Sequence, residues 1–129
     1  MVPGIPCDLF GDGQQIRLTI GKFLAIEQML KKPIGEIVAL QKSLDLTSLT
    51  VMLSVGMETP EGKHQSKPPQ WYASKIQELL MDGHGIDEIS TLVIKAVAAS
   101  GLLGHDAYLA VFPEAKTDDE IKKAEAEKN

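Results

Sequence analysis

Apolar residues recur along most of this 129-residue chain at intervals of three and four, the spacing of an amphipathic α-helix. The pattern predicts five short helices with one buried face each, over residues 22–31, 33–44, 45–56, 70–81 and 87–100. These faces include Met29 in the first helix and Trp71 and Leu80 in the fourth. A further short turn or helix is expected over residues 102–112. Because no stretch approaches about 18 consecutive apolar residues, we expect no membrane-spanning helix.

A different period appears near the start of the chain. Ile16, Leu18 and Ile20 alternate with polar residues, which predicts a half-buried β-strand. The Gly-Asp-Gly triplet at 11–13 allows the positive φ angles of a tight turn, so we expect a small N-terminal hairpin. The segment LTVML at 49–53, inside the third helical pattern, is also compatible with a buried strand.

Polar and helix-breaking residues set the boundaries between these elements. Residues 57–69 are rich in proline, glycine and charge, which predicts a long loop. Asp45 or Thr47 can cap the third helix, and Asp87 the fifth. We therefore expect a mainly α fold, with one helical domain and its hairpin over 1–113. A charged tail follows over 114–129, where Ile121 is the only large apolar residue, and we expect it to be partly disordered.

Charge and composition narrow the class of protein. The net charge is −5 and the chain has a single arginine, Arg17, which disfavours binding to nucleic acid phosphates. Aromatic residues make up only 5%, so the core must be mainly aliphatic. A lone Cys7 and the lack of a basic, then apolar, N-terminal segment favour a reducing cytoplasm.

No reactive side chain has a partner at a spacing that chemistry requires. His64 is expected to be a solvated loop residue and His84 a helix-end cap, while His105 and Asp106 are adjacent and point apart on a helix. The carboxylate of Asp8 would raise the pKa of the Cys7 thiol. We therefore expect a protein that is not an enzyme, with no metal and no cofactor.

Adaptable and aromatic side chains instead suggest partner binding. Methionine suits changing surfaces, and an exposed tyrosine often marks a contact; Tyr72 is expected at the surface and Trp71 in the core. The candidate partner-binding residues are Met52, Met57, Trp71, Tyr72, Leu102, Leu103 and Tyr108. Small residues of the fifth helix, such as Ala98 and Ala99, also predict association into a homo-oligomer.

The order of these parts resembles a known family. A strand runs into LTIGKFLAIEQMLKKPIGEIVA, which carries Glu27 and a Pro-Ile-Gly-Glu sequence at 33–36. A third helix then ends at Gly56, and an alanine-rich helix ends near Ser100. Over residues 9–113 this pattern is similar to the small tail assembly chaperones of long-tailed bacteriophages and gene transfer agents. The loop at 59–69 departs from it.

The resemblance implies a function that involves no catalysis. Such chaperones bind the long, hydrophobic tape measure protein and help to recruit tail tube subunits around it. They act in the cytoplasm of the bacterial host and are absent from the mature virion. The alternative hypothesis is a structural or adaptor subunit of a phage head or tail that is retained in the virion.

Overall fold

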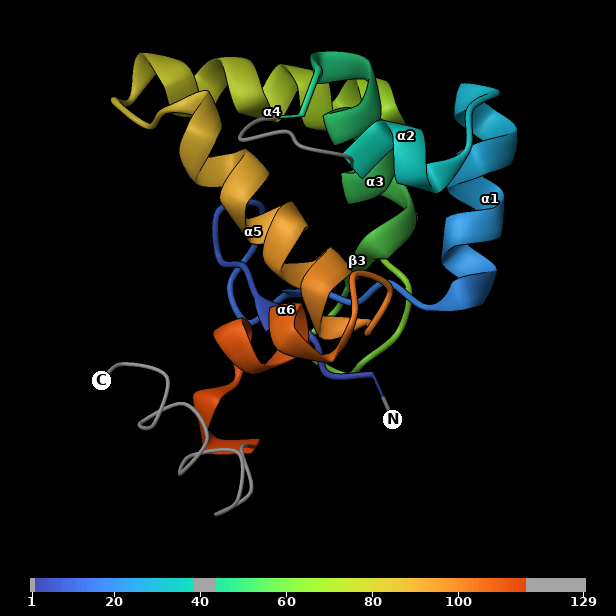
Figure 1. Ribbon diagram of the computed structural model, residues 1–129. Helices are drawn as coiled ribbons and strands as arrows, with labels where there is room; N and C mark the ends of the chain where they lie inside the picture. Colours follow the sequence, from blue (N-terminus) through green and yellow to red (C-terminus); the bar gives the residue numbers. More distant parts are fainter. Residues whose placement is uncertain (1, 39–43, 116–129) are drawn as a thin grey trace.

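The computed structural model describes residues 2–38 and 44–115 and is mainly helical, as the sequence predicted (Figure 1). The strands are β1 (Ile5–Pro6), β2 (Gln15–Ile16) and β3 (Met57–Glu58). The helices are α1 (Ile20–Leu30), α2 (Ile34–Val38), α3 (Leu46–Gly56), α4 (Pro69–Met81), α5 (Ile86–Ala99) and α6 (His105–Val111), and a 3₁₀ turn, Pro113–Ala115, follows. None of the helices within the described ranges combines the length and apolarity needed to cross a bilayer.

The predicted hairpin is part of a three-stranded antiparallel sheet in the order β1-β2-β3. Ile16 pairs with Ile5 on one side and with Met57 on the other. The third strand was missed because two residues are too short for a period-2 pattern, and the prediction of loop from Met57 onward was wrong there. The expected strand also ends early. Ile20 begins α1 and is 65% exposed, whereas Ile16 and Leu18 are fully buried.

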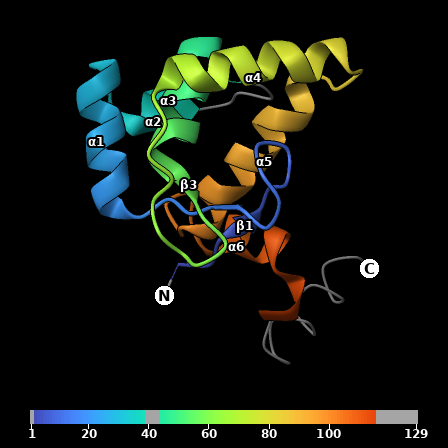
Figure 2. The ribbon, with the colours of Figure 1, turned by 180° about the vertical axis from the view of Figure 1, so that it is seen from behind.

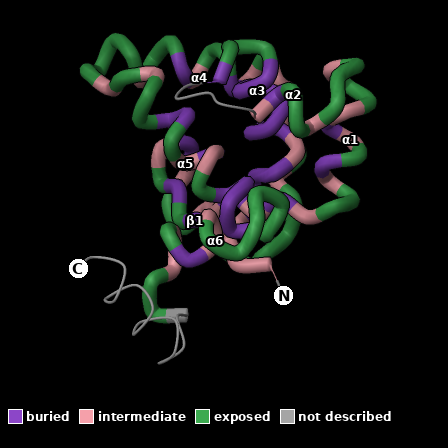
Figure 3. The backbone as a smooth tube through the Cα atoms, viewed as in Figure 1, coloured by how far each residue is buried: buried purple, intermediate pink, exposed green. Residues whose placement is uncertain are grey.

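Helix α3 lies at the centre of the molecule, in contact with α1, α4 and α5 (Figures 1 and 2). Its residues are buried on almost every side, as the purple tube shows in Figure 3. The helix interpretation of 49–53 is therefore correct and the strand alternative is wrong. Asp45 caps this helix, with its Oδ2 accepting a hydrogen bond from the Ser48 backbone N–H at 3.1 Å.

Three details of the outer helices differ from the prediction. Met29 and Leu80 are exposed, because α1 and α4 each contact α3 along a narrower stripe than their apolar residues span. The N-cap of α5 is Gly85, and Asp87 instead lies in the first turn, where its negative charge interacts favourably with the positive end of the helix dipole. The predicted second helix is wrong at its last residue, because Leu44 is not helical, whereas residues 39–43 and the tail from residue 116 lie outside the described residues.

Candidate functional site

Three of the predicted partner-binding side chains are in the core. Met52, Met57 and Tyr72 are fully buried, so they offer no surface to a partner in this structure. The expected exposure of Tyr72 is wrong: its ring packs edge-on between Phe10 and Trp71, at centroid distances of 5.2 and 4.9 Å. Its hydroxyl has no hydrogen-bond partner among the described residues, and burial raises the pKa of Tyr72 to about 12.

Trp71 lies at the edge of the core instead of at its centre. It is half-buried, and the Nζ atoms of Lys67 and Lys75 each lie 5.4 Å from its ring centroid. Such contacts favour a cation over the ring face. Tyr72 therefore takes the buried place predicted for Trp71, and Trp71 packs against the core from its edge. The burial of Tyr72 could have been predicted from the sequence of α4. Tyr72 and Ile76 are four residues apart and therefore lie on one face of the helix.

The remaining candidates lie around the turn between α5 and α6. Leu102 and Leu103 are exposed there, and Tyr108 is half-buried on α6. The Tyr108 ring stacks with that of His105 at 6.5 Å and contacts Phe112 at 5.2 Å. Of the seven candidates, Leu102 and Leu103 therefore present the most accessible apolar surface.

Leu103 belongs to a long depression on the outer face of α5, here called the α5 trough. Its apolar half has a volume of about 440 Å³ and is lined chiefly by Ile94, Ala98, Leu103, Ala107, Ala110 and Val111. Its acidic half, about 470 Å³, runs toward the start of α5 and includes Asp8, Asp87 and Glu88. Thr91 and Lys95, both exposed, line both halves, so the two hollows adjoin along α5.

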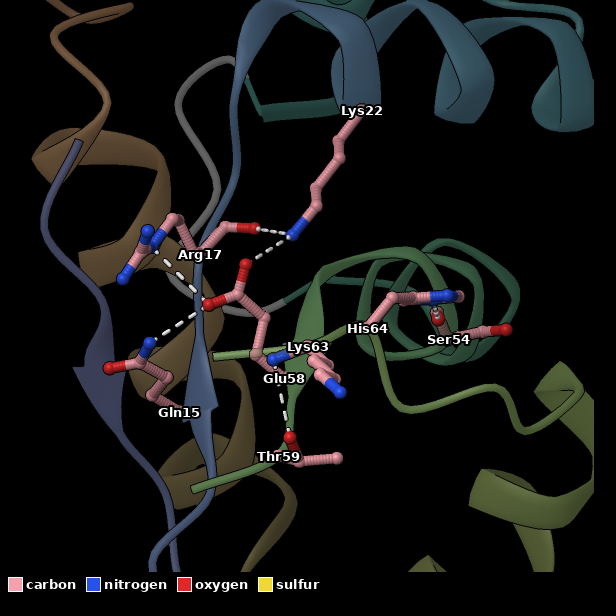
Figure 4. A network of polar contacts seen from close by, with 8 residues as sticks. All are labelled: Gln15, Arg17, Lys22, Ser54, Glu58, Thr59, Lys63 and His64. Carbon is pink, nitrogen blue, oxygen red and sulfur yellow. Dashed lines mark hydrogen bonds and ion pairs between the residues drawn. The ribbon is translucent and has the colours of Figure 1, made fainter. Parts of the chain in front are cut away.

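A polar cluster on the sheet was not predicted. The carboxylate of Glu58, itself buried, accepts a hydrogen bond from Gln15 Nε2 at 2.8 Å and another from Lys22 Nζ at 3.1 Å (Figure 4). Arg17 Nε lies 3.3 Å from Glu58 Oε1, within ion-pair range but not aligned for a hydrogen bond. Lys22 also donates to the Arg17 carbonyl.

This cluster joins elements that are far apart in sequence. The side chains come from β2, from the segment after it, from α1 and from β3, so the carboxylate links the sheet to the first helix. Two cations balance one buried anion, which reduces the cost of removing that anion from water. The alternation of Gln15 and Arg17 on one side of the strand was the available signal. Glu58 looked like a solvated loop residue because β3 was not recognised.

The histidines make local contacts. His64 is exposed as expected, and its Nε2 lies 2.9 Å from the Ser54 carbonyl oxygen, which holds the loop after β3 against α3 (Figure 4). His84 contacts the end of α4 through its backbone, because its N–H donates a hydrogen bond to the Leu79 carbonyl oxygen at 2.9 Å. Its side chain does not cap that helix, since Nδ1 lies 3.0 Å from Glu88 Oε2 on the next helix.

Cys7 is buried, and burial raises the pKa of its thiol, with Asp8 adding to the rise. The direction agrees with the prediction, although burial is the larger cause. A neutral thiol in this position is a poor nucleophile.

Within residues 2–38 and 44–115, no group of three or more histidine, cysteine, aspartate or glutamate side chains is arranged to hold a metal ion. Comparisons of the chain with protein families, with curated proteins and with solved structures found no significant match.

Proposed function

We propose that this protein is a non-catalytic phage tail assembly chaperone that binds the tape measure protein and helps to recruit tail tube subunits. The proposal starts from the resemblance in element order over residues 9–113. It places the protein in the cytoplasm of the bacterial host during assembly and predicts its absence from the mature virion.

One observation supports this function above others: the described surface carries large hydrophobic side chains that the protein's own core does not cover. They are Ile20, Leu24, Met29, Leu46, Leu80, Met81, Leu102 and Leu103. Single exposed leucines are ordinary, but here eight large apolar side chains are exposed on a domain of modest size. A chaperone for a hydrophobic chain needs such surface.

The best-defined of these faces joins α3 and α4. Leu46 is 61% exposed and Leu80 40% exposed on this face, and Met81, which is 79% exposed, follows Leu80 at the end of α4. A cleft of about 130 Å³ opens between Leu46, Ile76 and Leu80. An apolar stripe of a client helix can pack into a surface of this kind, and the flexible Met81 thioether can adapt to different side chains.

The charge of the chain is compatible with the same task. At −5 the protein repels other copies of its own complex, which keeps a coated hydrophobic client in solution.

Co-expression with a tape measure protein from the same genome tests the proposal. We expect the soluble fraction of the client to rise and the two proteins to co-purify. The double substitution Leu80→Asp and Met81→Asp should reduce both effects, and Leu80→Ile with Met81→Leu is the matched control that keeps the face apolar. If the wild-type protein leaves the client insoluble and unbound, the proposed function is wrong.

Mass spectrometry of purified particles separates the chaperone from the alternative structural or adaptor subunit. A chaperone is absent from finished virions, whereas a completion protein is present in stoichiometric amounts.

A further inference from the structure

We propose that a cluster of two lysines and a tryptophan, Lys67, Trp71 and Lys75, docks an acidic segment of a partner protein that carries two carboxylates about one helical turn apart. The cluster, here called the Lys-Trp patch, covers the first half of α4 and the residues just before it. The apolar face that includes Leu80 lies toward the other end of the same helix. The inference therefore concerns a second surface and does not depend on the proposed client.

The Lys-Trp patch gathers positive charge around one aromatic ring. The Nζ atoms of Lys67 and Lys75 each lie 5.4 Å from the ring centroid of Trp71, which is half-buried. The attraction of each ammonium group to the ring favours this arrangement. The two cations can therefore be no further apart than twice that distance, so one short segment of a partner can contact both.

The positive charge of the patch is incompletely balanced within the described residues. Lys67 has no ion-pair partner among them. Lys75 pairs with Glu78, at 3.2 Å between Nζ and Oε2, but the Glu78 side chain is 65% exposed. An exposed pair of this kind contributes little and can be exchanged for a pair with another carboxylate. The patch is thus a local excess of positive charge on a chain whose net charge is −5.

The backbone that carries Lys67 is held in place by the protein's own contacts. The hydroxyl of Ser54, a buried residue of α3, donates a hydrogen bond to the Lys67 carbonyl oxygen at 2.6 Å. Pro68 and Pro69 follow, and their rings restrict the φ angles at the start of α4. A side chain on a fixed backbone loses less conformational freedom on binding than one on a free loop. The patch is therefore pre-organised for a partner.

The positions of the two cations select the kind of partner. Side chains four residues apart on a helix lie on one face, with their Cβ atoms about 6 Å apart. Two carboxylates at this spacing can each reach one ammonium group, whereas carboxylates two residues apart on a helix point to different faces. The Trp71 ring offers apolar contact between the charged groups, as tryptophan commonly does at the centre of an interface.

Nucleic acid fits the Lys-Trp patch less well than an acidic peptide does. Single strands bind proteins through a row of cations and through bases that stack on open aromatic faces. The single arginine of the chain, Arg17, lies beside Glu58 in the sheet cluster. Because the lysine ammonium groups lie over the Trp71 ring, a base has little room to stack there.

Tryptophan fluorescence tests the site directly, because Trp71 is the only tryptophan in the chain. The probe is a helical peptide of about 16 residues, made of alanine and glutamine, with two glutamates four residues apart and no aromatic residue. We expect a saturable change in Trp71 emission, which weakens at high salt because exposed charges are screened. Moving the glutamates to a two-residue spacing should weaken binding several-fold, and replacing both by glutamine should abolish it.

Substitutions assign the binding to the two lysines. Lys67→Gln and Lys75→Gln should each weaken binding of the peptide about threefold, and together about tenfold, as expected for exposed charge pairs. Lys75→Arg should bind as the wild type does. Lys95→Gln, on α5, is the matched control, because it removes one exposed lysine outside the patch. Circular dichroism checks that all variants are folded.

Three results would overturn the inference. They are an unchanged Trp71 emission with the paired-glutamate peptide, equal binding by the double glutamine variant, and tighter binding of a single-stranded thymidine oligonucleotide than of the peptide. The last result would assign the patch to nucleic acid. The double glutamine variant should still solubilise the tape measure protein, so a failure of the chaperone proposal and a failure of this inference are separate observations.

Discussion

The centre of the molecule and the outer face of α5 use similar residues in opposite ways. Around α3 and the sheet, apolar side chains are covered on all sides, and Glu58, the buried charge there, is met by Gln15, Arg17 and Lys22. Along the α5 trough, leucine, alanine and three carboxylates face solvent, and Lys95 is left without an ion-pair partner among the described residues.

The difference separates residues that specify the fold from residues that remain available. A buried carboxylate surrounded by donors from three segments ties those segments into one arrangement. An apolar surface beside solvent-exposed charges adds little to folding, since its groups already lie in water. Substitutions in the two regions should therefore have distinct effects on stability and on association.

The largest loss of stability is expected from Leu49→Ala in α3. Leu49 is fully buried, so the substitution removes apolar contacts and leaves a cavity, at a cost of about 3 kcal/mol. Leu46→Ala on the same helix is the matched control, because Leu46 is mostly exposed, and it should cost less than about 0.5 kcal/mol. Urea denaturation measures both. Equal losses would show that α3 is not the centre of the core.

Glu58→Ala should be the next most damaging change. Removing the carboxylate leaves Arg17 and Lys22 facing each other without an anion, and we expect a loss of about 2 kcal/mol. This is below the usual cost for a fully buried pair, because both cations keep some contact with water.

Glu58→Gln separates charge from hydrogen bonding at this position. The amide oxygen can still accept from Lys22, so the loss should be roughly half that of the alanine variant. Thermal and urea unfolding of both variants check this. If neither variant is less stable than the wild type, the cluster does not fasten the sheet to α1.

These two regions also show what the sequence could and could not predict. The period of the apolar residues located α3, and the residues before it narrowed the cap to Asp45 or Thr47, because both features depend on neighbours within one helical turn. The partners of Glu58 could not be predicted, since Gln15 is 43 residues away and β3 is too short to leave a pattern.

The same reasoning explains why the sequence did not predict that Tyr72 is more deeply buried than Trp71. Adjacent residues on α4 point about 100° apart, so a small error in the predicted buried face of this helix changes which of the two aromatic side chains is expected in the core. The α5 trough could not be predicted from the sequence for a related reason. It is formed by two helices and an N-terminal segment, and only their packing brings Thr91 near Ala107 and Cys7.

Asp45→Ala should have a smaller effect that depends on pH. The hydrogen bonds from Ser48 hold the pKa of Asp45 below its ordinary value of 3.8. A lowered pKa in the folded state means that the stabilisation is present at neutral pH and is lost as the pH falls through the folded pKa. The alanine variant should lose about 1 kcal/mol at pH 7 and converge with the wild type in acid.

Asp45→Asn distinguishes the cap from the charge. Asparagine accepts the same backbone hydrogen bond without titrating, so this variant should retain most of the stability at pH 7 and show no such convergence. Urea unfolding at a series of pH values provides the comparison. A constant difference between wild type and alanine variant at all pH values would contradict the ionised cap.

The smallest effect is expected from removing residues 115–129. Ile121 is the only large apolar residue in this segment, so little apolar area can be buried by it, and the change in unfolding free energy should be below about 0.5 kcal/mol. Differential scanning calorimetry of the truncated and full chains measures the difference. A large fall in melting temperature would mean that this segment stabilises the domain.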